Sequence, residues 1–136
     1  MIDRERTMAT TYGFAVSDWQ ALRDWAQRKL QQVARGQQTI AYSDLTAAAS
    51  RAGLVAPDPH SSATAGLLGQ IALLEHEAKR PLLSAVVVHK SGDLAPGPGF
   101  WNFARELDMA TSTGEHAELA FWSKELQRCH AYWRNH

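Results

Sequence analysis

The sequence lacks most of the features that would assign it at once to a chemical class. Its single cysteine, Cys129, excludes an intramolecular disulfide and a cysteine zinc cage within one chain. Basic and acidic residues number 14 each, so the net charge is zero and the basic excess of most dedicated nucleic-acid binders is missing. No apolar run approaches the ~20 residues of a membrane span. We therefore expect a chain that does not cross a membrane and lies in the cytoplasm.

The N-terminal residues show no pattern of a targeting signal. Met1–Arg6 carries charges of both signs and no apolar segment follows it, so we do not expect a signal peptide. Residues 1–11 have no periodicity and are predicted to be a flexible tail, although Tyr12, Phe14 and Val16 alternate as a short extended arm would. Residues 12–136 have the length of one domain.

One stretch, Pro81–Phe100, holds both a convincing buried strand and a loop dense in glycine and proline. Its valines at 86–88 form an apolar run of strand length, bounded by a proline and a Ser-Gly-Asp turn. Proline fixes φ, and glycine permits positive φ, so the loop is predicted to be shaped. We expect a strand and hairpin here, around which the rest of the chain is organised.

Helical periodicity marks the remaining segments. Ser17, Ser43 and either Ser61 or Ser62 are the predicted N-caps of the first three helices. Gly66 and Gly69 weaken the third helix by ~1 kcal/mol each relative to alanine, which indicates close approach of a neighbour or a ligand. The predicted helices are 18–35, 44–52, 63–79, 100–107 and 115–133, with a short strand at 39–42.

This order of elements is that of a winged helix, in which strands and a wing follow a helix-turn-helix. The predicted fold class is α+β and mostly helical, a winged-helix-like domain (helix-turn-helix plus a small β-hairpin) with added N- and C-terminal helices. The final helix is predicted to present one apolar seam that includes Leu119 and Cys129, with the cysteine as a small buried hydrophobe.

Residues 36–107 resemble the DNA-binding domain of alkylguanine-DNA alkyltransferases and alkyltransferase-like proteins. Thr39–Thr46 is similar to that family's opening strand and Tyr-x-x-Leu-Ala helix start, and Gly66–Leu74 to its recognition helix. Pro81–Ser84 is similar to its Pro-Cys-His-Arg segment, and Gly97–Phe100 to its glycine-rich wing. The prolines, valines and glycines of this stretch also resemble small prokaryotic winged-helix proteins. The resemblance implies a DNA-binding fold.

The departures from that family concern its chemistry. Leu82 stands where the resemblance places the reactive cysteine, and Leu83 and Ser84 replace the activating His-Arg. Alkyl transfer needs a thiolate and is therefore excluded by this alignment. The recognition helix has no arginine at Thr64–Leu68 and ends in Glu75-His76-Glu77, which would repel phosphate, so the resemblance does not extend to base flipping.

The six histidines show no spacing typical of a metal site, and we predict no metal, no cofactor and no catalytic residue. His89-Lys90-Ser91 at the strand end is the better polar cluster, and its two interpretations are a phosphate contact and a solvent-exposed hairpin tip. An enzymatic alternative is a small hydrolase or nuclease that uses His89 with Glu75 or Asp93.

The leading hypothesis is a non-enzymatic protein that binds nucleic acid, with DNA as the expected partner. The alternative is a protein-interaction or regulatory module that binds a protein partner or a second copy of itself, with an exposed aromatic patch formed by Trp25, Trp101 and Tyr132. The predicted nucleic-acid contacts are Tyr42, Ser43, Thr64, Lys79, Arg80, Lys90 and Ser91.

Overall fold

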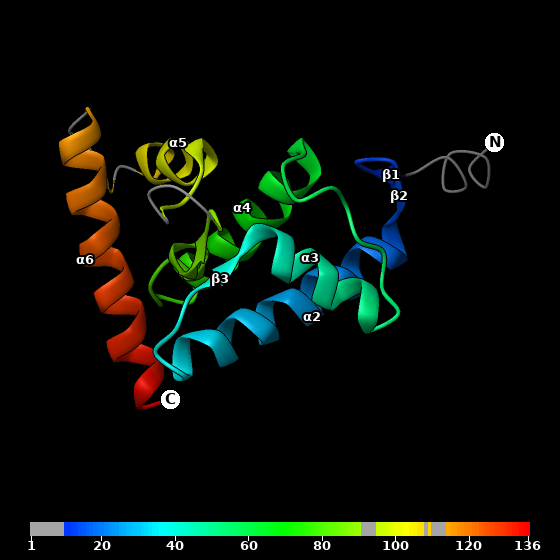
Figure 1. The fold of residues 1–136 in the computed structure, drawn as a ribbon, viewed down its shortest axis with the longest axis horizontal. Coiled ribbons are helices and arrows are strands. Elements are labelled where there is room, and N and C mark those ends of the chain that lie inside the picture. Colours follow the sequence, from blue (N-terminus) through cyan, green and yellow to red (C-terminus); the bar gives the residue numbers. More distant parts are fainter. Residues whose placement is uncertain (1–9, 91–94, 108, 110–113) are drawn as a thin grey trace.

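A computed structural model describes residues 10–90, 95–107, 109 and 114–136 (Figure 1). The protein is α+β and mostly helical, as expected. No helix among these described residues is long and apolar enough to cross a membrane. In chain order the elements are β1 (Thr10–Thr11), β2 (Phe14–Ala15), α2 (Val16–Arg35), β3 (Ile40–Ala41), α3 (Tyr42–Arg51), α4 (Ser62–Glu77), the 3₁₀ turn η1 (Leu83–Val86), β4 (Val87–Val88), α5 (Pro98–Glu106) and α6 (Glu115–Arg134).

The chain enters α2 from an antiparallel hairpin. Thr10 pairs with Ala15 and Thr11 with Phe14, so part of the predicted tail is a strand, and residues 1–9 lie outside the described residues. Tyr12 and Gly13 form the turn, both with positive φ, as a two-residue type I′ hairpin requires. The alternation at residues 12–16 therefore belongs to a hairpin and the start of a helix.

Helix α2 supplies the longest side of the core. Helical spacing predicts a buried stripe of Trp19, Leu22, Ala26, Leu30 and Val33. The first four are buried, and Val33 is half-buried. The predicted cap at Ser17 is wrong, because the helix begins at Val16 and no side chain caps it. Strand β2 ends at Ala15, so the helix begins directly after the hairpin, one residue before Ser17.

Helices α3 and α4 each pack against α2, and their first residues contribute to the site. Helix α3 begins directly after β3, at Tyr42, so the predicted Ser43 cap is wrong. The predicted N-cap of α4 at Ser61 is confirmed, since the Ser61 hydroxyl accepts a hydrogen bond from the Thr64 amide at 3.3 Å. Helical spacing from Leu67 and Ile71 predicts Leu74 on the core face of α4. Leu74 is instead exposed, and Glu75 is the buried residue at this point.

The predicted β-hairpin of Pro81–Phe100 is the main correction. Strand β4 pairs in parallel with β3, Ile40 opposite Val87, and the described residues contain no antiparallel partner for it. Gly97–Phe100, the predicted wing, is instead the N-cap and first turn of α5, where Pro98 suits the first helical position because its missing amide is not needed there. The valine run is buried on both faces, which is typical of a parallel strand.

Helix α6 flanks the molecule and covers η1 and α2 (Figure 1). The Trp122 indole donates to the carbonyl of Ala85 at 2.8 Å. Cys129 is fully buried as predicted, and that burial raises its pKa to about 12. Leu119, predicted on the seam, is exposed. The predicted aromatic patch is wrong, because Trp101 is buried in a second small core with Phe100.

Candidate binding pocket

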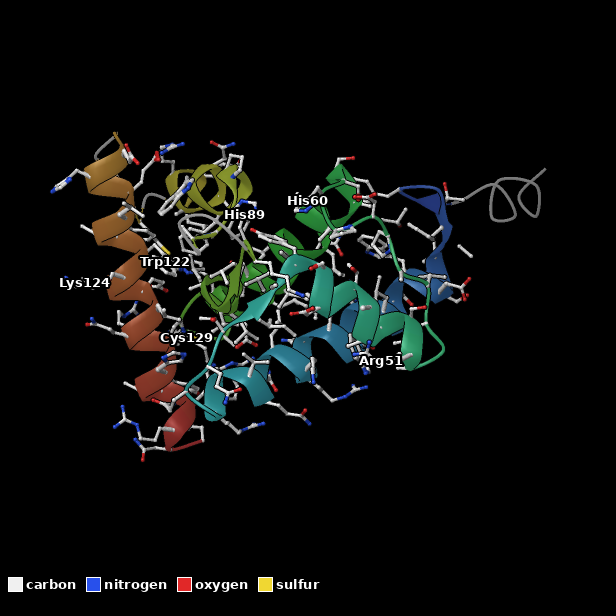
Figure 2. The ribbon with its side chains drawn as sticks, viewed as in Figure 1. Arg51, His60, His89, Trp122, Lys124 and Cys129 are labelled. Carbon is white, nitrogen blue, oxygen red and sulfur yellow. The ribbon has the colours of Figure 1, made fainter. Side chains whose placement is uncertain are left out.

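A cavity of about 270 Å³ opens between the starts of α3, α4 and α5. Small-molecule sites occupy ~300–1,000 Å³, so this cavity suits one small ring system. Figure 2 shows His60 and His89 side by side near the centre of the molecule, above α3. The pocket is lined by Tyr42, Pro59, His60, Ser61, Ala65, Leu68, Gly69, Ser84, His89, Gly97, Pro98, Gly99, Phe100 and Phe103.

Three rings from distant segments form one wall of the pocket. The centroids of Tyr42 and His89 lie 5.1 Å apart, and the rings of His60 and His89 stack at 5.9 Å. The β-ladder explains part of this arrangement. Ala41 pairs with Val88 in parallel, so the next residues, Tyr42 and His89, leave the same end of the sheet together. The ladder thus places two of the three rings.

Tyr42 also joins the wall to the start of α5. Its phenolic oxygen accepts a hydrogen bond from the Gly97 amide at 2.7 Å. A Cβ at position 97 would lie 3.2 Å from that oxygen and 3.5 Å from Nε2 of His89, so glycine permits the close approach. Burial raises the pKa of Tyr42, which keeps the phenol protonated and its O–H available as a donor.

Ser84 places a hydroxyl in the pocket. The residue is only 7% exposed and lines the pocket. Leu82 is fully buried in the second core and is not among the described residues that line the pocket. Within Pro81–Ser84, the residue that faces the pocket is therefore Ser84, whose hydroxyl can both donate and accept.

The electrostatics of the pocket favour an anionic group nearby. The N-caps of α4 and α5, Ser61 and Gly97, both line the pocket, and neither helix has an acidic residue in its first turn. Helix N-termini carry a partial positive charge and free backbone amides. Among the residues that the structure describes, no carboxylate lines the pocket. A negatively charged ligand would meet favourable dipoles here.

Of the six predicted contacts that the structure describes, Tyr42 alone lines the pocket. Ser43 is the next residue after Tyr42 in α3. Lys90 is the next residue after His89, and its ammonium lies 3.3 Å from the Asp44 carboxylate in an exposed ion pair. Ser91 lies outside the described residues. Tyr42, Ser43 and Lys90 thus belong to one region of the surface.

Thr64 is a structural residue in this fold. It is 1% exposed and its hydroxyl donates to the Asp58 carbonyl at 2.7 Å. The predicted phosphate contact is corrected accordingly, because a buried and satisfied hydroxyl is not presented to a ligand.

Lys79 and Arg80 lie beyond the opposite end of α4, about 24 Å from its start for a helix of 16 residues. The Arg80 guanidinium pairs with the buried Glu75 carboxylate at 2.8 Å, and that carboxylate also accepts from Gln27 at 2.7 Å. The seven predicted contacts therefore do not form a single surface.

The contacts of Glu75 also bear on the enzymatic alternative centred on His89, in which Glu75 or Asp93 would be the acid–base partner. Glu75 is bound to Arg80 and Gln27 and does not contact His89, and Asp93 lies outside the described residues. In the part of the chain that the structure describes, no three histidine, cysteine or acidic side chains are grouped as metal ligands.

Sequence reasoning missed His60 and Ser84. His60 lies in the Pro-Asp-Pro-His turn, and Ser84 follows two leucines. Gly69 also lines the pocket, in agreement with the expectation that a glycine within this helix marks the close approach of a neighbour or a ligand.

Comparisons of the chain with family models, with curated proteins and with solved structures found no match. The function therefore has to be inferred from the chemistry of the pocket.

Proposed function

We propose that the protein is a non-enzymatic nucleic-acid-binding protein whose pocket receives one unpaired base. The observation that carries this proposal is the wall of Tyr42, His60 and His89 beside the buried hydroxyl of Ser84. Proteins hold an extrahelical base by stacking it on aromatic rings and by hydrogen bonds to its edge. The pocket offers both kinds of group in a volume of about 270 Å³, which is small for a dinucleotide cofactor.

The surroundings of the pocket support a nucleotide, because its phosphate would lie next to the base. The starts of α4 and α5 provide amides and positive dipole ends, and the Lys90 side chain is 70% exposed on the same side. Because these groups can contact only a few phosphates, we expect modest affinity for nucleic acid and a binding constant that falls only slightly as salt increases.

An unpaired base is favoured over a base extruded from intact duplex. The exposed residues in the first turns of α4, Ser62 and Ala65, are small and uncharged and offer no side chain to wedge into the stack. Extrusion costs a few kcal/mol, and that cost is smallest where the base is already unpaired.

A winged-helix-like role for α3 and α4 is part of this proposal, with α4 as the element nearest the nucleic acid. It is supported by the resemblance of residues 36–107 to alkyltransferase DNA-binding domains. Binding without catalysis is proposed because the pocket lining contains no carboxylate and no imidazole hydrogen-bonds to Ser84 among the described residues.

Fluorescence anisotropy with three DNA probes tests the proposal. The probes are a short single strand, a fully paired duplex, and the same duplex with one extra unpaired base, each at low and moderate salt. We expect the single strand and the bulged duplex to bind about ten- to a hundredfold more tightly than the paired duplex, reflecting the unstacking cost. Equal affinity for all three, or no binding at low salt, would contradict the proposal.

A matched pair of variants locates the binding. Gly69 lines the pocket, and a Cβ there would have only Phe103 nearby, at 4.0 Å. Gly69→Leu should fill the cavity without harming the helix and abolish the preference for unpaired bases. Leu73→Ala, an exposed position on the same helix, should leave it unchanged.

A protein-interaction function has one separate supporting observation. Leu73 and Leu74 are adjacent on α4 and are 40% and 39% exposed. We propose as the second candidate that this apolar pair contacts a protein partner or a second copy. Light scattering should then show an oligomer that Leu73→Glu with Leu74→Glu dissociates, and a monomer at all concentrations would remove the self-association form of this candidate.

A further inference from the structure

Tyr12 is an exposed aromatic side chain that the fold holds in a fixed position beside the pocket. It sits in the turn of the β1–β2 hairpin and is 50% exposed. One side of its ring packs on Trp19, with the two centroids 5.2 Å apart. The ring therefore has a protein-bound side and a solvent side.

The position of Tyr12 depends on a glycine of α4. A Cβ on Gly66 would overlap the phenol, whose Cε2 would lie 2.6 Å away. Tyr12 also adopts φ +53°, a left-handed conformation that is uncommon for a residue other than glycine. The positive φ of Tyr12 and the missing side chain of Gly66 together fix the position of the aromatic ring. The tyrosine is nevertheless half exposed, so packing alone does not account for this arrangement.

Gly66, against which the Tyr12 phenol lies, is next to the pocket. Ala65, the preceding residue of α4, lines the pocket, and Gly69 lines it one turn further on. The helix surface between the pocket and Tyr12 is thus made of small residues, Ser62, Ala65 and Gly66. A polymer strand could approach the helix backbone closely along this path and reach the phenol.

We propose that Tyr12 is a second stacking platform, which binds the base of the nucleotide next to the one whose base enters the pocket. This inference rests on the proposed function, and it makes the preferred partner a single strand of at least two nucleotides. An aromatic face stacks on any base, so the platform adds affinity without sequence preference.

The test compares ligand length between wild type and Tyr12→Ala. Thymidine monophosphate, the dinucleotide and the tetranucleotide are titrated by calorimetry or competition. Wild-type affinity should rise from mono- to dinucleotide, and Tyr12→Ala should lose about five- to 150-fold for the longer ligands, the range of one base–aromatic stack. Its affinity for the mononucleotide should be unchanged, and Tyr12→Phe should behave as wild type at every length.

Gly66→Ala provides a second variant that keeps the tyrosine but displaces its ring, while raising helix propensity. It should reproduce the length-dependent loss of Tyr12→Ala. Wild-type length dependence in both variants would overturn the platform, as would an equal loss for mono- and tetranucleotide, which would indicate damage to the pocket itself. Absence of binding by the wild-type protein contradicts the proposed function instead, so the two failures are distinguishable.

Discussion

The phenolic oxygen of Tyr42 accepts a hydrogen bond from the backbone amide of Gly97 at 2.7 Å, which joins the first residue of α3 to the N-cap of α5. The parallel pairing of β3 with β4 brings His89 beside Tyr42. The His89 amide then donates to the carbonyl of Ala95 at 3.0 Å, which brings the nearby Gly97 to the same place. This hydrogen bond therefore connects the wall formed by Tyr42, His60 and His89 to the start of α5.

Tyr42→Phe should lower both stability and ligand binding. The substitution leaves the Gly97 amide without its acceptor, which costs about 1–3 kcal/mol when the group stays away from water. We expect that decrease in the free energy of unfolding by urea, together with weaker binding of single-stranded DNA. An unchanged unfolding free energy would show that the bond does not stabilise the pocket.

Ser84→Ala and Leu82→Ala should have opposite effects. Leu82 is fully buried, so truncation should cost about 2–5 kcal/mol of unfolding free energy. Ser84 lines the pocket, so removal of its hydroxyl should leave stability within about 0.5 kcal/mol. Binding of an unpaired base should weaken about two- to tenfold through one lost hydrogen bond. Unfolding curves and DNA titrations of both variants check this, and unaltered binding by Ser84→Ala would remove that residue from the site.

Arg80→Ala should destabilise the fold much more than Lys79→Ala. Glu75 is fully buried and Arg80 is its cationic partner at 2.8 Å, so removal of Arg80 leaves a buried carboxylate unpaired. Breaking such a pair costs about 3–5 kcal/mol, reduced here because the Arg80 side chain is 28% exposed.

Lys79 is the matched control for Arg80, as an exposed neighbour whose loss should stay within about 0.5 kcal/mol. Thermal and urea unfolding of both variants give the comparison. Equal stability of the two variants would mean that Gln27 and the surrounding groups suffice to hold Glu75.

Cys129 should make stability fall at alkaline pH. Its pKa is raised to about 12 in the folded state, above the ordinary value of ~8.5, so the unfolded chain loses this proton first. The contribution is complete below pH ~8.5 and declines as the pH rises from there toward the folded pKa. Unfolding free energies from pH 8 to 10 should fall more steeply for wild type than for Cys129→Ala, and identical slopes would contradict the buried-thiol assignment.

Local patterns predicted the helices because burial of one face and helical spacing are properties of neighbouring residues. Local sequence patterns predicted three features correctly: the buried stripe of α2, the N-cap at Ser61 and the burial of Cys129. Helix starts were missed at Ser17 and Ser43, where a preceding strand already directs the chain into the helix.

The pocket could not be predicted in the same way because it depends on long-range pairing. The apolar valine run predicts a buried strand but does not name the strand with which it pairs, and the parallel pairing with β3 is what places His89 beside Tyr42. Ser84 reaches the cavity because Leu83–Val86 form a 3₁₀ turn, a local conformation that its leucine-rich context did not indicate.

The most direct test of a base-binding pocket is a ¹H–¹⁵N NMR titration with a short single-stranded oligonucleotide. We expect the largest amide shifts at Gly69, Gly97 and Gly99, which line the cavity. Shifts confined to Lys79, Arg80 and Arg128 at the far end of α4, with the pocket glycines unmoved, would contradict it.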